Sequence, residues 1–134
     1  MPLPDMMIQE AGQLSTLSQS CRALAEFAQA ISGTTFQREG NQWVSRPDNF
    51  VTMTIQHARA QTVVVCVRGN PTEFRSDPTL PFEIRPAQAG YSRFTIQHIQ
   101  QLAGAADCIE RAWTIYQRGR DRQHTQPHVV EHPV

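Results

Sequence analysis

The sequence predicts an α+β domain in which one antiparallel sheet of three to five strands is covered on one face by two amphipathic helices. Three observations lead to this expectation. Apolar residues recur with helical spacing near both ends of the 134-residue chain, strand-like runs occupy its middle, and a short polar connection joins the two strongest runs. We expect a single domain over residues 1–119, followed by a disordered polar tail over residues 120–134.

Composition limits the chemistry that the chain can perform. Twelve basic and twelve acidic residues give a net charge of zero, and every basic residue is an arginine. The chain therefore has no general attraction to nucleic acid or to an anionic membrane, and it cannot use a lysine nucleophile or Schiff base. No run approaches the roughly 20 apolar residues of a membrane span, and the first residues lack the pattern of a signal peptide. We expect a cytoplasmic protein without a membrane partner.

The three cysteines do not form a recognisable disulfide or metal pattern. Cys21, Cys66 and Cys108 lie far apart, each within an apolar segment. Such cysteines behave as small buried core residues in a reducing compartment. We therefore expect three free thiols.

The first predicted helix shows apolar residues at alternating steps of three and four over residues 14–31. Asp5 could cap a long form of this helix, whereas Ser15 or Thr16 could cap a short form, and Gly33 marks its end. The same spacing fits a coiled coil. A single helix of this length, however, more often faces the core of a globular domain.

The middle of the chain predicts the strands. Residues 36–45, which contain Gly40-Asn41, fit a small hairpin or an edge strand. Residues 50–56 alternate apolar and polar, and residues 62–67 are almost continuously apolar and β-branched, which indicates a hairpin whose second strand is central. Residues 91–97 alternate again and predict a strand with one face exposed to water.

Residues 70–90 form a long crossing loop in this interpretation. Four prolines fall in this segment, and only Leu80–Ile84 could form a short strand. Loops of this length are uncommon in compact domains unless they cover or bind something.

The closing helix carries an apolar stripe over residues 99–116 and is expected to end at Arg118-Gly119. Beyond it, histidines recur at steps of four at positions 124, 128 and 132. This spacing would align metal ligands on a helix, but the prolines at 127 and 133 argue against a helix there. We predict no metal site and no cofactor.

Alternation along the strands divides their side chains between the two faces of the sheet. The face toward the helices is expected to carry Val51, Met53, Ile55, Val63, Val65, Val67, Phe94 and Ile96. The opposite face is expected to carry Thr52, Thr54, Gln56, Val64, Cys66, Arg68, Tyr91, Arg93 and Thr95.

Five residues of that opposite face are candidates for ligand binding: Arg68, Tyr91, Arg93, Thr52 and Thr54. Arginine donates bidentately to phosphate or carboxylate, and tyrosine can stack on a base. The same residues also fit a solvated face, or a face covered by the 70–90 loop with its arginines paired to loop carboxylates.

No catalytic signature is present. His57 could be combined with Cys66 or Asp48 as a base and nucleophile, but a hairpin would separate His57 from Cys66 by most of a strand. We predict no catalytic residues, although an enzyme of unrecognised type stays open.

Part of the chain resembles a known family. The carrying residues are Arg85-Pro86, the run 89–94 (AGYSRF), and the segment 101–113 with Ile109-Glu110-Arg111-Ala112-Trp113. They are similar to the C-terminal half of an uncharacterised bacterial domain labelled a predicted transport protein, in which the helix ends in Ile-x-x-Ala-Tyr. Here Trp113 takes the place of the tyrosine. The resemblance implies a small α+β domain, often attached to restriction or phage-defence proteins, and brings no catalytic residues.

These observations support two functional expectations. The first is a non-catalytic, cytoplasmic binding or protein-interaction module that associates with itself or with another protein, because Val64, Cys66 and Tyr91 would leave apolar surface exposed. The alternative is a nucleotide or single-stranded nucleic-acid binder that uses Arg68, Tyr91 and Arg93. The sequence does not identify the ligand or the partner.

Overall fold

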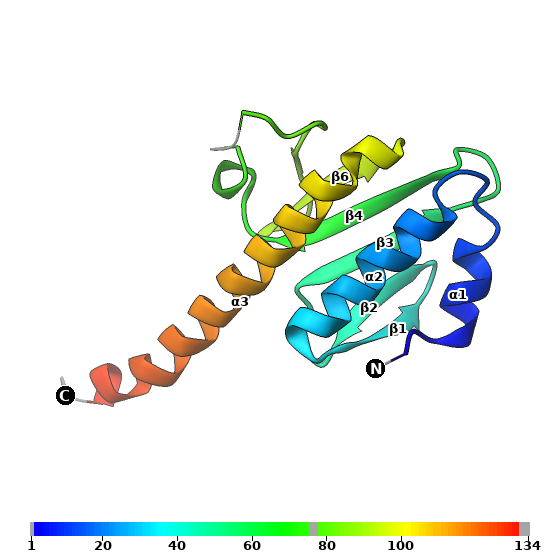
Figure 1. Ribbon diagram of the computed structural model, residues 1–134. Helices are drawn as coiled ribbons and strands as arrows, with labels where there is room; N and C mark the ends of the chain where they lie inside the picture. Colours follow the sequence, from blue (N-terminus) through cyan, green and yellow to red (C-terminus); the bar gives the residue numbers. More distant parts are fainter. Residues whose placement is uncertain (1, 76–77, 132–134) are drawn as a thin grey trace.

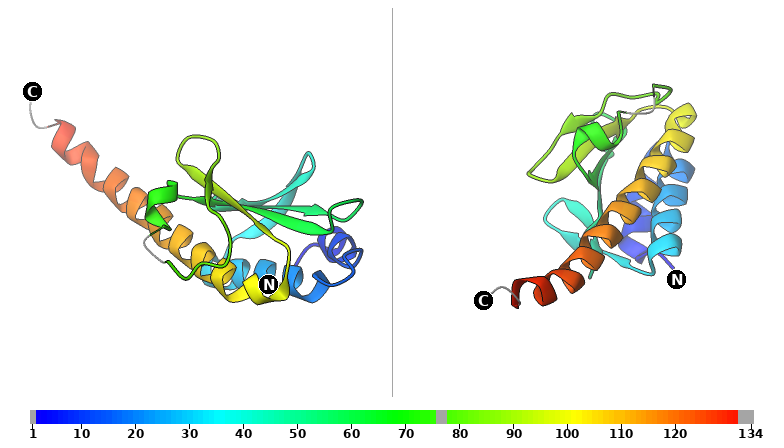
Figure 2. Two further views of the ribbon diagram at one scale, coloured as in Figure 1. Left: turned by 90° about the horizontal axis from the view of Figure 1, so that it is seen from above. Right: turned by 90° about the vertical axis from the view of Figure 1, so that its left-hand side faces the viewer.

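A computed structural model describes residues 2–75 and 78–131, with side chains up to residue 120. It contains one antiparallel sheet and three α-helices, which confirms the predicted α+β class. Helices α2 (Ser18–Ser32) and α3 (Leu102–Glu131) lie on the same side of the sheet, as Figures 1 and 2 show. Among the described residues, no helix is both long enough and apolar enough to cross a bilayer.

The sheet has six strands, more than the three to five predicted. They are β1 (Thr35–Glu39), β2 (Gln42–Arg46), β3 (Val51–Gln56), β4 (Thr62–Arg68), β5 (Arg85–Pro86) and β6 (Tyr91–Ile96). Their order is β1-β2-β3-β4-β6-β5, and all neighbours are antiparallel. The residues around Gly40-Asn41 form a hairpin rather than a single edge strand, and β4 is central as expected.

The register confirms how side chains are divided between the two faces. Directly opposite residues share a face, and Met53, Val65 and Phe94 form one such row across β3, β4 and β6. All eight residues assigned to the helix side are buried. The intervening residues, among them the row Thr52, Cys66 and Arg93, lie on the opposite side, which we call the outer face.

The N-terminal segment forms two helices instead of one. Helix α1 spans Asp5–Ala11, and α2 begins only at Ser18, so neither the long nor the short form of the predicted helix is correct in full. The break is fixed by a distant contact, because Gln61 Oε1 accepts a hydrogen bond from the Ser15 N–H at 2.7 Å. The predicted end is confirmed: Gly33 follows α2 with a φ of 72°, where glycine avoids the strain of a side chain.

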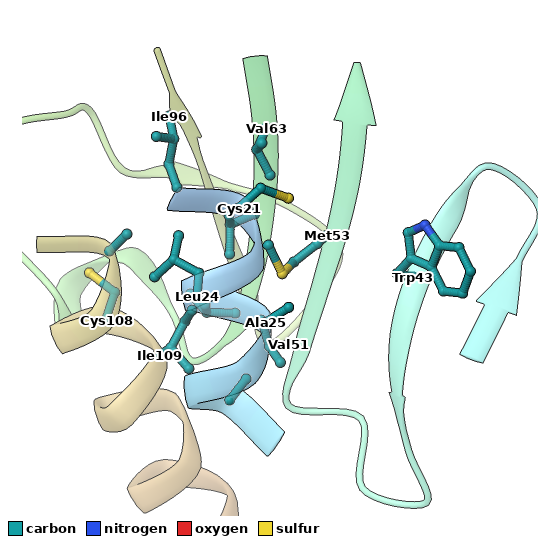
Figure 3. Packing of buried hydrophobic residues seen from close by; sticks show 14 of the residues in the cluster. Cys21, Leu24, Ala25, Trp43, Val51, Met53, Val63, Ile96, Cys108 and Ile109 are labelled. Atoms are coloured by element: carbon teal, nitrogen blue, oxygen red, sulfur yellow. The ribbon is translucent and has the colours of Figure 1, made fainter. Parts of the chain in front are cut away.

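The core lies between the helices and the sheet. Figure 3 shows Leu24 of α2 and Ile109 of α3 in this layer, near strands that carry Val51 and Val63. All four side chains are almost completely buried, with exposed fractions of 0–1%. The apolar stripe of the first predicted helix therefore packs into a globular core, which fits a core-facing helix better than a coiled coil.

Helix α3 continues beyond its predicted end. The apolar pattern predicts an end at Arg118-Gly119, but the helix extends to Glu131 and projects past the sheet (Figure 1). The expectation that the prolines exclude a helix here is wrong for Pro127, which lies inside α3 although it has no N–H to donate. A glycine inside a helix costs about 1 kcal/mol relative to alanine, and non-proline residues added to an existing helix each contribute a hydrogen bond. The division between a 1–119 domain and a separate tail stays a prediction, and the tail histidine side chains lie outside the described residues.

The loop between β4 and β6 packs on the helix side. Phe74 is buried, and Phe82 stacks on Phe94 with ring centroids 4.3 Å apart. Gln101 Nε2 donates to the Pro81 carbonyl at 3.0 Å. The expected strand at Leu80–Ile84 is wrong. A proline in this segment has no N–H to donate to a ladder, and the Phe82 side chain packs on the Phe94 ring instead. The short strand is β5, directly after it.

Candidate anion-binding face

The outer face brings two of the predicted arginines together. Arg68 on β4 lies directly opposite Tyr91 on β6, and Cys66 lies directly opposite Arg93. Arg68 and Arg93 are therefore diagonal neighbours on adjacent strands, a separation within reach of long side chains. This placement follows from the pairing of β4 with β6.

Arg68 is held in place by Tyr91. Its guanidinium carbon lies 5.3 Å from the centroid of the Tyr91 ring, and its Nη1 donates to the Tyr91 hydroxyl at 3.3 Å. The hydroxyl in turn donates to the Asn49 carbonyl at 2.8 Å. Tyr91 thus holds the Arg68 guanidinium in place, and the guanidinium covers one face of the Tyr91 ring.

Arg93 is exposed and makes no ion pair with any of the residues described in the structure. Burial raises the pKa of the Cys66 thiol opposite it, and the positive charge of Arg93 partly offsets this rise. On its other side, Arg93 is the direct cross-strand partner of Arg85. Like charges in this position repel, and only Arg85 is compensated, by Glu83 at 3.2 Å.

Arg46 adds no free charge to the outer face. Its Nε and Nη2 donate to the two carboxylate oxygens of Glu39 at 2.6 and 2.8 Å. This hydrogen bonding lowers the pKa of the Glu39 carboxyl, so the pair stays ionised. The arginines available for a ligand are therefore Arg68 and Arg93.

The two threonines predicted for the site contribute less. Thr52 lies in the row of Cys66 and Arg93, yet its exposed fraction is only 9%. Thr54 is half-buried and lines a separate cavity of about 390 Å³ near His57. The register makes Thr52 a diagonal neighbour of Arg68, which lies opposite Phe50, whereas Thr54 lies farther along β3 from Arg68.

The loop carboxylates are engaged away from Arg68 and Arg93. Glu73 accepts a hydrogen bond from the Asn70 N–H at 3.1 Å and lies 3.9 Å from Arg118. Glu83 pairs with Arg85, and Asp77 lies outside the described residues. Within the described part of the loop, neither arginine of the outer face meets a carboxylate. The alternative in which the loop neutralises this face is therefore not supported by Glu73 or Glu83.

The side chains considered for catalysis do not assemble. His57 lies beyond the end of β3, whereas Cys66 is four residues into β4, about 13 Å along the strand. Asp48 instead accepts a hydrogen bond from the Tyr116 hydroxyl at 2.8 Å and lies 4.0 Å from Arg120. Across the described ranges, no group of three or more His, Cys, Asp or Glu side chains could hold a metal ion.

Sequence reasoning missed a polar cleft beside the outer face. It has a volume of about 530 Å³ and lies between residues 81–85 and β6. Its walls include Arg85, Arg93, Gln97 and Gln101. The local sequence signal for this cleft is the pair Arg85 and Arg93, which flank the turn at Gly90. This signal is weak, because the sequence does not show that β5 pairs with β6.

Comparison with known proteins adds no further guide: no protein-family model matches the chain, and no curated protein or solved structure matches it significantly. The resemblance to the predicted transport protein family rests on the sequence motifs alone and stays a prediction.

Proposed function

We propose that this domain is a non-catalytic binding module whose outer face binds the phosphates of single-stranded nucleic acid or of a nucleotide. The observation that carries the proposal is the placement of Arg68 and Arg93 as diagonal neighbours without a carboxylate partner among the described residues. Guanidinium groups donate bidentately to phosphate oxygens, and two of them on one face can each bind a phosphate of the same strand.

Tyr91 has a positioning role in this proposal. The sequence suggested that its ring could stack on a base, but Arg68 already lies against the ring and shares its hydroxyl. An arginine that is held in one geometry loses less conformational entropy when it binds an anion. Tyr91→Phe should therefore weaken phosphate binding by loosening Arg68 rather than by removing a stacking platform.

Salt dependence of binding tests the proposal. Single strands release about 0.7 counterions per phosphate contact, so two arginine contacts predict a slope of about −1.4 in a plot of log K against log salt. Fluorescence anisotropy with a short labelled oligothymidylate measures this slope. Arg68→Gln and Arg93→Gln should each reduce its magnitude by about 0.7 and weaken binding.

A matched control separates this site from general charge effects. Arg22 is exposed on α2, on the opposite side of the sheet, so Arg22→Gln removes the same charge from a different surface. We expect it to leave the slope unchanged. Binding that is insensitive to salt, or that falls equally in Arg22→Gln and Arg93→Gln, would contradict the proposal.

Self-association, the other function suggested by the sequence, is supported less well. Val64, Cys66 and Tyr91 are half-buried, and the large apolar side chains that are exposed among the described residues are Met6 and Ile99, neither of which is on the sheet. Light scattering over a range of concentrations tests this alternative directly. A concentration-dependent dimer disrupted by Val64→Asp would place the interaction on the outer face and favour the interaction module.

A further inference from the structure

The backbone of β6 has an open edge. Successive residues of a strand direct their main-chain N–H and C=O to opposite neighbours. The Gly90 carbonyl accepts from the Gly69 N–H on the side of β4, whereas the next carbonyl, that of Tyr91, accepts from the Ala87 N–H on the other side. Residues 91, 93 and 95 therefore direct both their N–H and C=O away from β4. Arg93 faces Arg85 of β5 there.

Thr95 lies beyond the end of β5. That strand has only two residues, Arg85 and Pro86, which pair with Arg93 and Ser92. No hydrogen bond from a described residue reaches the N–H or C=O of Thr95 at this edge. Farther along, the N–H of Gln97 donates to Gln101 Oε1 at 2.6 Å, which closes the edge. A single residue thus offers a donor and an acceptor side by side.

The open edge at Thr95 borders the cleft described above. Thr95 and Arg93 both line it, together with the side-chain amides of Gln56, Gln97 and Gln101. Its volume of about 530 Å³ lies in the range of small-molecule sites. Arg93 supplies an exposed positive charge to the cleft, whereas Arg85 beside it is paired at 3.2 Å with Glu83, which also lines the cleft.

We infer that this cleft holds one nucleotide unit of the bound ligand, with its phosphate on Arg93 and the Watson–Crick edge of its base on the main chain of Thr95. The inference rests on the proposed function and specifies where the base goes. The Watson–Crick edge of each base presents a donor and an acceptor next to each other, which complements the N–H and C=O of one edge residue. Base pairing would block this contact, so the ligand must be unpaired.

The first test uses chemically modified ligands and the unchanged protein. Methylation of thymine at N3 removes the donor of its Watson–Crick edge without changing its charge. Oligothymidylate should bind about 2- to 10-fold more tightly than the N3-methylated oligomer, which corresponds to the loss of one hydrogen bond. Equal affinities with a normal salt slope would overturn the inference and leave the proposed function intact, whereas no salt-dependent binding of either oligomer would overturn both.

Two variants then locate the contact. Thr95→Pro removes the N–H that faces the open edge and none that bonds to β4, and proline is tolerated in a strand at such positions. Thr95→Val changes the side chain and keeps the main-chain donor. Discrimination against the methylated oligomer should persist in Thr95→Val and disappear in Thr95→Pro, with the salt slope unchanged in both. Discrimination that survives Thr95→Pro would place the base elsewhere.

Discussion

Replacing Gly69 with alanine should destabilise the fold strongly, because this glycine sits where the outer face, the loop and α3 meet. Its φ is +125°, a conformation that side chains rarely adopt. An added Cβ would lie 2.8 Å from Ile115 Cδ1 and 2.9 Å from Phe74 Cε2. Backbone strain of this kind costs about 1–3 kcal/mol and overpacking a further 1–3 kcal/mol, so we expect a loss of about 2–6 kcal/mol.

Urea unfolding followed by circular dichroism measures this loss as a lower midpoint at constant slope. Gly119 provides the matched control, since it lies within α3 and, apart from the adjacent residues and the nearby backbone of its own helix, no heavy atom of the described residues lies within 4 Å of an added Cβ. Gly119→Ala should stabilise the protein by up to about 1 kcal/mol through helix propensity. A Gly69→Ala variant as stable as the unchanged protein would refute the packing of Phe74 and Ile115 around the end of β4.

Three further predictions concern other parts of the chain. The buried Ser45 hydroxyl donates to the Asp48 carbonyl at 2.7 Å and accepts from the Phe50 N–H at 3.2 Å. Ser45→Ala should therefore lower the free energy of unfolding, measured in urea, by about 1–3 kcal/mol. An unchanged midpoint would contradict this network. Burial raises the pKa of the Cys21 thiol from 9.0 to about 12. The thiol therefore loses its proton at a lower pH in the unfolded chain than in the folded protein, and the free energy of unfolding should fall as pH rises from 9 to 12. Cys21→Ala should make that fall shallower, and an equal slope would contradict the shift. Limited proteolysis should trim residues 120–134 and leave a stable core, whereas a resistant tail would contradict the predicted domain boundary.

Local patterns were sufficient to predict the two faces of the sheet. Strands β3, β4 and β6 each span six or seven residues, long enough for alternation to show, and every inward residue predicted from them is buried. Strand β5 could not be predicted, because it has two residues and includes Pro86. The division of the first helix into α1 and α2 could not be predicted either, because it involves a hydrogen bond from the Ser15 N–H to Gln61, which is 46 residues away.

The candidate site was predicted in part for the same reason. Alternation placed Arg68, Tyr91 and Arg93 on one face, but their mutual arrangement follows from the register of β4 against β6, which the sequence does not encode locally. The cleft depends on where β5 ends, leaving Thr95 without a neighbour at the open edge among the described residues. The cleft exists because β5 ends before it reaches Thr95, and the local sequence does not show where β5 stops pairing with β6.

The most direct test of the binding proposal is a two-dimensional NMR titration of the isotopically labelled protein with oligothymidylate. We predict salt-sensitive shifts of the Arg68 and Arg93 Nε–H signals and of the Thr95 amide, with the amides of α2 unchanged. Shifts confined to the opposite surface, for example around Asp107 and Glu110 of α3, would contradict the proposed site. The absence of any shift at low salt would contradict nucleic-acid binding altogether.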